Sequence, residues 1–156
     1  MEITFNQADK KDIDQLIKLR IAYMKEDFGQ VSDYEKTCME EQLTDYFNRK
    51  LGTELIVFVA RDGEKIVATA YLHIIEMPAS VPVLTGFTSS VLNVYTEPEY
   101  RGRGICTKLI KNLVEYGKNR GLSRIDLSAT KDGYPVYKKA GFEELNSHYT
   151  EMRMRF

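Results

Sequence analysis

The sequence has few of the residues that build metal centres and disulfide frameworks. Its 156 residues include two cysteines, Cys38 and Cys106, two histidines, His73 and His148, and no tryptophan. The cysteines lie far apart and match neither a disulfide framework nor the close spacing of a zinc site. We therefore expect free thiols in a reducing compartment, the cytoplasm, and no bound metal.

The sequence also lacks an excess of one charge and long apolar runs. Lysine and arginine number 22 and aspartate and glutamate 23, so the formal net charge is −1. This balance gives no general attraction to nucleic acids or membranes. The apolar runs are far shorter than a bilayer span, and the N-terminus has no signal-peptide core. We expect no nucleic-acid partner, no membrane association, and a single domain over residues 1–156.

What the chain does have is a clear succession of apolar periodicities. Alternating or continuous apolar runs predict strands over residues 1–7, 55–60, 65–75, 87–96 and 123–129, with one or two more in 142–156. Three- and four-residue spacings predict helices over residues 9–24, 32–52, 103–120 and 134–140. Strands and helices in this order indicate an α/β layered domain with a mixed sheet.

The junction between the fourth strand and the third helix contains two glycines, Gly102 and Gly104. The first backbone amides of a helix have no helical acceptor, and together with the helix dipole they favour an anion such as pyrophosphate. Arg101 and Arg103 add positive charge beside these amides, and the Thr107 hydroxyl adds a donor. The junction is therefore a candidate phosphate site.

Other phosphate motifs fit this junction poorly. A P-loop needs a lysine followed by serine or threonine directly after its second glycine, and no such pair stands here. A Rossmann fingerprint needs a third glycine where Thr107 stands, and it normally lies in the first strand–helix unit. The glycines could also serve only a tightly packed turn. The junction alone leaves a phosphate site and a packing turn equally open.

Two segments together carry a resemblance to a known family. The segment Arg101-Gly102-Arg103-Gly104-Ile105-Cys106 resembles the R/Q-x-x-G-x-G/A signature of the GNAT superfamily, N-acetyltransferases that use acetyl-CoA. Residues 135–142, PVYKKAGF, resemble the L-Y-x-K-x-G-F segment of the same family. The two segments occur in the family's order, and the resemblance covers residues 87–143. Cys106 departs from the last signature position, but cysteine is also small and apolar.

The resemblance implies a fold, a cosubstrate and an activity. The fold would be an α/β (α+β) GNAT-like layered domain, with a central mixed, mostly antiparallel sheet of six to seven strands flanked by about four helices. Acetyl-CoA would be the cosubstrate, and its acetyl group would pass directly to a primary amine in a ternary complex. The acceptor would be a small molecule or a peptide, and the resemblance is compatible with a homodimer.

The resemblance also implies roles for individual residues. The start of the third helix would hold the pyrophosphate, and the preceding strand would pair with the pantetheine arm and direct an amide near Val94 at the thioester carbonyl. Tyr137 would donate a proton to the departing thiolate, since a phenol is protonated at neutral pH. The cofactor-binding set comprises Leu92, Asn93, Val94, Tyr95, Arg101, Gly102, Arg103, Gly104, Ile105, Cys106, Thr107 and Lys108.

Several assignments remain open at this level. The general base could be any of Glu76, Glu97, Glu99, Glu151 or His73, or a water relay could replace it. Residues 20–50 and 76–87 lie outside most of the matched motifs, and we expect them to shape the acceptor pocket, with Tyr23, Phe28, Tyr34 and Tyr46 as candidate lining residues. The alternative function is a non-catalytic acyl-CoA-binding sensor or partner module; a nucleotide-binding enzyme is a third hypothesis.

Overall fold

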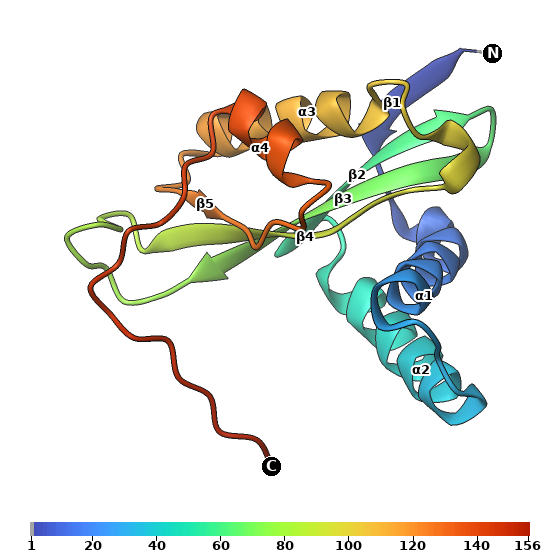
Figure 1. The fold of residues 1–156 in the computed structure, drawn as a ribbon, viewed down its shortest axis with the longest axis horizontal. Helices are drawn as coiled ribbons and strands as arrows, with labels where there is room; N and C mark the ends of the chain where they lie inside the picture. Colours follow the sequence, from blue (N-terminus) through green and yellow to red (C-terminus); the bar gives the residue numbers. More distant parts are fainter. Residues whose placement is uncertain (1) are drawn as a thin grey trace.

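Five strands form one mixed sheet with helices on both of its faces (Figure 1). The computed structural model describes residues 2–156. The strands are β1 (Ile3–Gln7), β2 (Leu55–Asp62), β3 (Lys65–Glu76), β4 (Phe87–Thr96) and β5 (Ile125–Asp126). They lie in chain order across the sheet, and only the last pair, β4 with β5, is parallel.

The helices lie in two pairs. Their bounds are α1 (Ile13–Phe28), α2 (Asp33–Lys50), α3 (Ile105–Arg120) and α4 (Tyr134–Ala140), with short 3-10 turns η1 (Lys10–Asp12) and η2 (Pro98–Tyr100). The start of α2 follows from its sequence: Ser32 and Glu35 accept hydrogen bonds from each other's backbone amides and form a capping box. No helix among residues 2–156 is long and apolar enough to cross a membrane.

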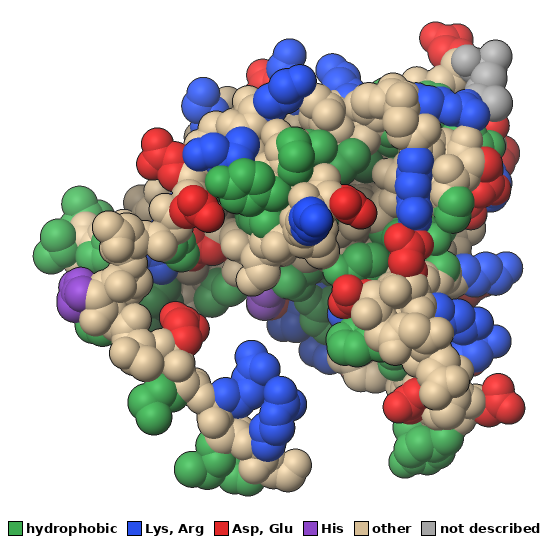
Figure 2. Space-filling view, in the orientation of Figure 1, with side chains coloured by type: hydrophobic (Ala, Val, Ile, Leu, Met, Phe, Trp, Pro, Cys, Tyr) green, Lys and Arg blue, Asp and Glu red, His purple; other side chains and the backbone are tan. Residues whose placement is uncertain are grey.

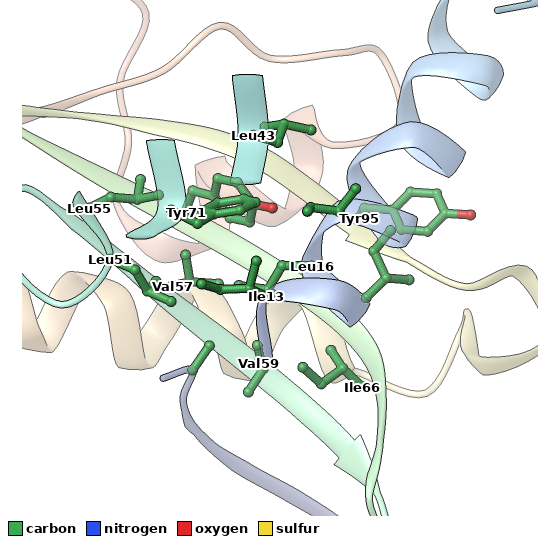
Figure 3. Close-up of a cluster of buried hydrophobic side chains, with 14 of the residues drawn as sticks. Ile13, Leu16, Leu43, Leu51, Leu55, Val57, Val59, Ile66, Tyr71 and Tyr95 are labelled. Atoms are coloured by element: carbon green, nitrogen blue, oxygen red, sulfur yellow. The ribbon is translucent and has the colours of Figure 1, made fainter. Parts of the chain in front are cut away.

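Each face of the sheet has its own apolar core. Side chains alternate along a strand, so the run at β2 sends Val57 and Val59 to one face and Ile56 and Phe58 to the other. The first core lies under α1 and α2 (Figure 3), and the second lies under α3 and α4. Because both faces are covered, β2 is buried along most of its length and reads as a continuous apolar run.

The predicted fold class and the four helices are confirmed, but the predicted sheet is too large. The observed sheet has five strands rather than the predicted six to seven. Residues 142–156 form no strand, although their residues alternate in polarity. A strand also needs a neighbour to pair with, and this segment has none among residues 2–156. The last strand is two residues long, and α3 begins at Ile105 rather than Arg103, because Gly102 and Gly104 adopt positive φ.

Candidate active site

A cleft of about 1450 Å³ runs across the sheet where β4 meets the ends of three helices. Its walls come from α1, β4, the start of α3, the chain after β5, and α4, and residues 145–151 border it in part. Figure 2 shows the molecule hollowed between the α1–α2 pair and the segment that leads to the C end. Most of the residues expected to bind a cofactor lie in this cleft.

Strands β4 and β5 separate inside the cleft. Their parallel pairing consists of Ser89 with Ile125 and Ser90 with Asp126, and the ladder then stops. Beyond this point residues 91–96 and 127–130 form no ladder with each other, and residues of both segments line the cleft. Among the described residues, this part of β4 has no strand neighbour on that side, so an extended ligand could pair with its backbone there.

A bulge distorts β4 at the same place. Thr69 of β3 pairs with Tyr95 and Tyr71 pairs with Leu92, so two residues of β4, Asn93 and Val94, stand opposite one residue of β3. Asn93 has φ of 48°, a left-handed conformation that asparagine tolerates better than most residues. Both bulged residues line the cleft.

Buried side-chain hydrogen bonds hold the bulge. The side-chain amide of Asn93 donates to the Thr69 hydroxyl at 2.9 Å, and this hydroxyl donates to the backbone carbonyl of Asn93 at 3.2 Å. Arg20 of α1 donates from Nη1 to Asn93 Oδ1 at 3.2 Å. The sequence analysis missed Thr69 and Arg20. A threonine at a buried position of a predicted strand was the available signal, because such a hydroxyl needs a partner.

The start of α3 presents unpaired amides to the cleft. Gly102 and Gly104 have φ of 74° and 77°, and the first bond into the helix runs from the Lys108 amide to the Gly104 carbonyl at 3.1 Å. Within residues 2–156, the amides of residues 104–107 have no hydrogen-bond acceptor. A Cβ built on either glycine would meet no atom within 4 Å. The junction therefore combines free donors with open space, as an anion site requires.

The basic residues of the motif have other partners. The Arg101 guanidinium donates to Glu26 Oε2 at 2.6 Å and to the Thr96 carbonyl at 2.8 Å, which joins the junction to α1. The Arg103 guanidinium donates to the Glu99 carbonyl at 2.8 Å and lies over the Tyr100 ring. Arg101 borders the cleft, whereas Arg103 and Lys108, both expected to bind the cofactor, do not.

Tyr137 reaches the cleft from α4 and is almost buried. Its ring packs edge-to-face on Phe142, with the ring centroids 5.9 Å apart. Gly133 gives this ring room, because a Cβ there would lie 2.9 Å from it. Burial, with smaller contributions from Cys106 and Tyr23, raises the pKa of Tyr137 to about 12. The Tyr137 hydroxyl is therefore protonated at neutral pH, and it makes no hydrogen bond to any described residue.

Cys106 lies in the same part of the cleft. Its side chain is partly buried, and this burial raises the pKa of the thiol. The thiol is therefore protonated at neutral pH, unlike the activated thiolates found at some helix starts. We therefore interpret Cys106 as a packing residue rather than a nucleophile.

The α1 wall of the cleft carries charged and aromatic side chains. Its lining residues are Arg20, Tyr23, Met24, Glu26, Asp27 and Phe28. Of the four aromatic residues expected in an acceptor pocket, Tyr23 and Phe28 line the cleft. Tyr34 is exposed outside it, and Tyr46 packs on the core residue Phe47. No residue of 76–87 lines the cleft, so the structure does not place that loop at this site.

The carboxylates of the cleft differ from those considered as a base. Among the earlier candidates only Glu151 lines it. Glu97 and Glu99 lie near the Lys65 ammonium instead, and Glu76 and His73 lie outside the cleft. The sequence analysis missed the cleft residues Asp27, Asp126 and Asp132. No motif marks them, because they come from three separate elements.

Comparison with known proteins assigns the family. Residues 16–142 match the model of the Acetyltransferase (GNAT) family. The chain belongs to this family. The chain is similar to the crystal structure of a predicted acetyltransferase with acetyl-CoA from Clostridium acetobutylicum. The two sequences are 35% identical, the match covers 97% of this chain and 96% of the other, and the TM-score is 0.83. The predicted family, fold class, reaction class and cosubstrate are thereby confirmed at the level of the family.

Shorter similarities connect the chain to curated relatives. An uncharacterized N-acetyltransferase of Methanocaldococcus jannaschii is 37% identical over 59 residues, which are 36% of this chain and 26% of the relative. A thialysine N-epsilon-acetyltransferase of Mus musculus is 33% identical over 75 residues, 46% of this chain and 44% of the relative. The chain thus matches less than half the length of each, and these relatives do not identify its acceptor.

Proposed function

We propose that this chain transfers the acetyl group of acetyl-CoA to a primary amine, directly and within a ternary complex. The observation that carries the proposal is one continuous cleft, which joins the open amides of α3, the bulge of β4 and the Tyr137 hydroxyl. The similar structure from Clostridium acetobutylicum, described with acetyl-CoA, supports the cosubstrate.

The chain's own backbone would hold the cosubstrate, which supplies an activated thioester. The amides of residues 104–107 suit a diphosphate, since they lack acceptors and the neighbouring glycines leave space for a close approach. The unpaired side of β4 suits the extended pantetheine arm. A backbone amide at Val94, displaced from the regular ladder by the bulge, would stabilise the negative charge that develops on the thioester oxygen.

Tyr137 would act as a hydrogen-bond donor to the departing sulfur. With a pKa of about 12 it keeps its proton throughout the physiological range. Complete transfer of this proton to a thiolate with an ordinary pKa near 8.5 would cost about 5 kcal/mol. We therefore assign Tyr137 to sharing its proton with the sulfur as charge develops there, with water completing the protonation of the released thiol.

The charge of the cleft favours a cationic acceptor. Asp27, Asp132 and Glu151 line it, and none of them forms an ion pair with another residue of 2–156. Arg20 is the one lining cation without a carboxylate partner among the described residues. These carboxylates would attract a protonated amine, and water between them could accept its proton before attack. The mouse relative, a thialysine N-epsilon-acetyltransferase by name, makes a side-chain amine a reasonable first acceptor to test.

A thiol-release assay tests the proposal. Acetyl-CoA is supplied with a panel of amines comprising a polyamine, lysine, thialysine, an amino sugar and a peptide with a free α-amine. We expect amine-dependent release of coenzyme A with at least one of them. If acetyl-CoA binds in calorimetry but no amine releases thiol, the alternative of a non-catalytic acyl-CoA-binding module replaces the enzymatic one. Stabilisation by ATP or NAD but not by coenzyme A would instead favour a nucleotide enzyme.

A further inference from the structure

The Arg20 guanidinium in the cleft uses little of its hydrogen-bonding capacity. It donates one hydrogen bond, from Nη1 to Asn93 Oδ1 at 3.2 Å, and it forms no ion pair with any of residues 2–156. An arginine side chain carries five N–H donors, so most of these donors have no acceptor among the described residues. Arg20 is half-buried and lines the cleft, and a ligand there could therefore reach the unused donors.

Other arginines in comparable positions have carboxylate partners. The buried Arg61 donates to Asp12 Oδ2 at 2.7 Å, and Arg101, which borders the same cleft, donates to Glu26 Oε2 at 2.6 Å. Pairing of this kind is the rule, because a charge that is partly removed from water is costly unless an opposite charge compensates it. The exception at Arg20 indicates that its anion comes from a ligand.

The side chains near Arg20 are neutral hydrogen-bond donors. Burial raises the pKa of Tyr23, Tyr46 and Tyr71, and the charge of Arg20 lowers each pKa in part. The Tyr71 hydroxyl is buried and has no hydrogen-bond partner among residues 2–156. Figure 3 shows this hydroxyl pointing toward the Tyr95 side of the core. These phenols keep their protons at neutral pH, so they do not neutralise Arg20 and leave it able to bind an anion.

The carboxylates of the cleft lie at other places than Arg20. Asp27 follows Arg20 by seven residues on α1, so the two share a face of the helix and are about 10 Å apart along its axis. Asp132 and Glu151 line the cleft from other segments. A cation and several carboxylates at separate positions suit a ligand that itself carries both charges.

Arg20 also lies beside the proposed site of acetyl transfer. Its hydrogen-bond partner, Asn93, directly precedes Val94, whose backbone amide we assign to the thioester oxygen. An anion held by Arg20 would therefore lie about one side-chain length from the thioester. An amine on the same small molecule could then reach the thioester carbonyl.

We propose that the acceptor is a small amino acid whose carboxylate binds to Arg20 while its amine faces the thioester. This inference rests on the acetyltransferase function proposed above and narrows its acceptor. Because Asn93 takes only Nη1, the Nε–Nη2 edge of the guanidinium is available for a two-point contact with a carboxylate. An amino sugar has no carboxylate, and a peptide with a free α-amine has an amide in its place, so neither should be a good acceptor.

Thiol-release kinetics with matched pairs of amines test the proposal. Each pair joins an amino acid to the same molecule without its carboxylate: L-alanine with ethylamine, L-lysine with cadaverine, and L-phenylalanine with phenethylamine. We expect kcat/KM to be at least about tenfold higher for the amino acid in the preferred pair, since hydrogen bonds between charged groups are the stronger ones.

Variants of Arg20 separate recognition of the carboxylate from support of Asn93. Arg20→Gln should raise KM for the amino acid at least about tenfold and leave KM for its decarboxylated partner nearly unchanged. Arg20→Lys, which keeps the charge, should restore part of the preference. A purely structural role through Asn93 would instead lower activity toward both members of a pair equally. The matched control is Lys25→Gln, which removes an exposed cation of α1 outside the cleft and should not change the preference.

Two kinetic results would overturn the proposal while leaving the acetyltransferase function intact. One is equal use of the amino acid and its decarboxylated partner by the wild type, or release of thiol only with an amino sugar or a peptide. The other is an unchanged preference in Arg20→Gln.

If no amine releases thiol, the acetyltransferase function fails, and calorimetry then tests the Arg20 site by itself. The three amino acids are titrated into protein saturated with coenzyme A. At least one should bind, and Arg20→Gln should weaken this binding at least about tenfold while Lys25→Gln does not. Absence of binding by all three, or equal binding to wild type and Arg20→Gln, would overturn the proposal.

Discussion

The two long walls of the cleft are made in different ways. The wall formed by α3 and α4 offers backbone amides, two glycines without obstruction and one buried phenol. The wall formed by α1 offers charged and aromatic side chains, including Arg20, Tyr23 and Asp27. The ion pair between Arg101, just before α3, and Glu26 of α1 connects the two walls. A ligand bound between them would meet main chain on one side and side chains on the other.

The two kinds of wall suit two different tasks, binding of the cosubstrate and recognition of the acceptor. Backbone amides recognise a diphosphate by geometry, and glycine at positions 102 and 104 allows the positive φ that directs these amides. Side chains recognise an acceptor by charge and shape, and many different sequences could supply side chains of the required charge and shape. We therefore assign the cosubstrate to the α3–α4 wall and the acceptor to the α1 wall. The following predictions test that division from the largest expected effect to the smallest.

Replacing Gly104 by alanine should have the largest effect, on coenzyme A affinity. Gly104 and Gly121 stand at the two ends of α3 with φ of 77° and 76°, and each has open space where a Cβ would go. Both substitutions should cost a similar stability of about 1 kcal/mol from the positive φ. Only Gly104→Ala should weaken coenzyme A binding, by about a hundredfold, since its Cβ enters the proposed diphosphate site. Equal affinities in the two variants would contradict the assignment.

Replacing Tyr137 by phenylalanine should lower turnover while sparing affinity. Loss of the hydroxyl removes the proposed donor to the sulfur, and we expect kcat to fall at least about tenfold. Tyr134→Phe, on the more exposed side of the same helix, should change neither kcat nor affinity. Steady-state kinetics and calorimetry measure the two quantities. Unchanged kcat in Tyr137→Phe would exclude Tyr137 from the mechanism.

Changing Asn93 should affect turnover through the backbone. Asn93→Ala removes the side-chain bonds to Thr69 and Arg20 and places alanine at φ of 48°, so kcat should fall about fivefold. Asn93→Gly also removes these bonds but tolerates the φ, and it should retain more activity than the alanine variant. If both variants lose the same activity, the side-chain bonds matter and the φ does not.

Alkaline unfolding should show the smallest effect. The folded-state pKa of Tyr137, about 12, lies above its ordinary value of 10, so the unfolded chain loses this proton first. The resulting stability is complete below pH 10 and is lost as the pH rises toward 12. At pH 11 wild type should have lost about 1 kcal/mol more than Tyr137→Phe, relative to pH 9. Denaturant titrations at the two pH values measure this, and an identical loss in both proteins would contradict it.

The sequence predicted the α3–α4 wall better than the α1 wall for a physical reason. Gly102, Gly104 and Tyr137 lie in two short segments whose local conformation is set by their own residues. The bonds among Arg20, Thr69 and Asn93 join three separate elements. The sequence indicates at most that the buried Thr69 hydroxyl needs a partner, and it does not show which residues supply one. The separation of β4 from β5 likewise depends on packing rather than on strand propensity.

Residues 142–156 show the opposite case, because their local pattern predicts strands that do not form. Alternation in residues 142–156 is a strand signal, yet these residues have no strand neighbour among those that the structure describes. Pairing is a property of two segments, so propensity cannot specify whether the partner belongs to the same molecule. The number of strands was therefore the least predictable feature of the sheet.

The most direct test of the account follows the backbone amides by NMR while coenzyme A is titrated into the protein. The account places the diphosphate at the start of α3, so the amide resonances of residues 102–107 should show the largest shifts. Adenosine 3′,5′-bisphosphate, which lacks the diphosphate bridge and the pantetheine arm, should shift these amides much less. Largest shifts at any other helix start, or on the α1 wall, would contradict the claim that the main chain at this junction binds the cosubstrate.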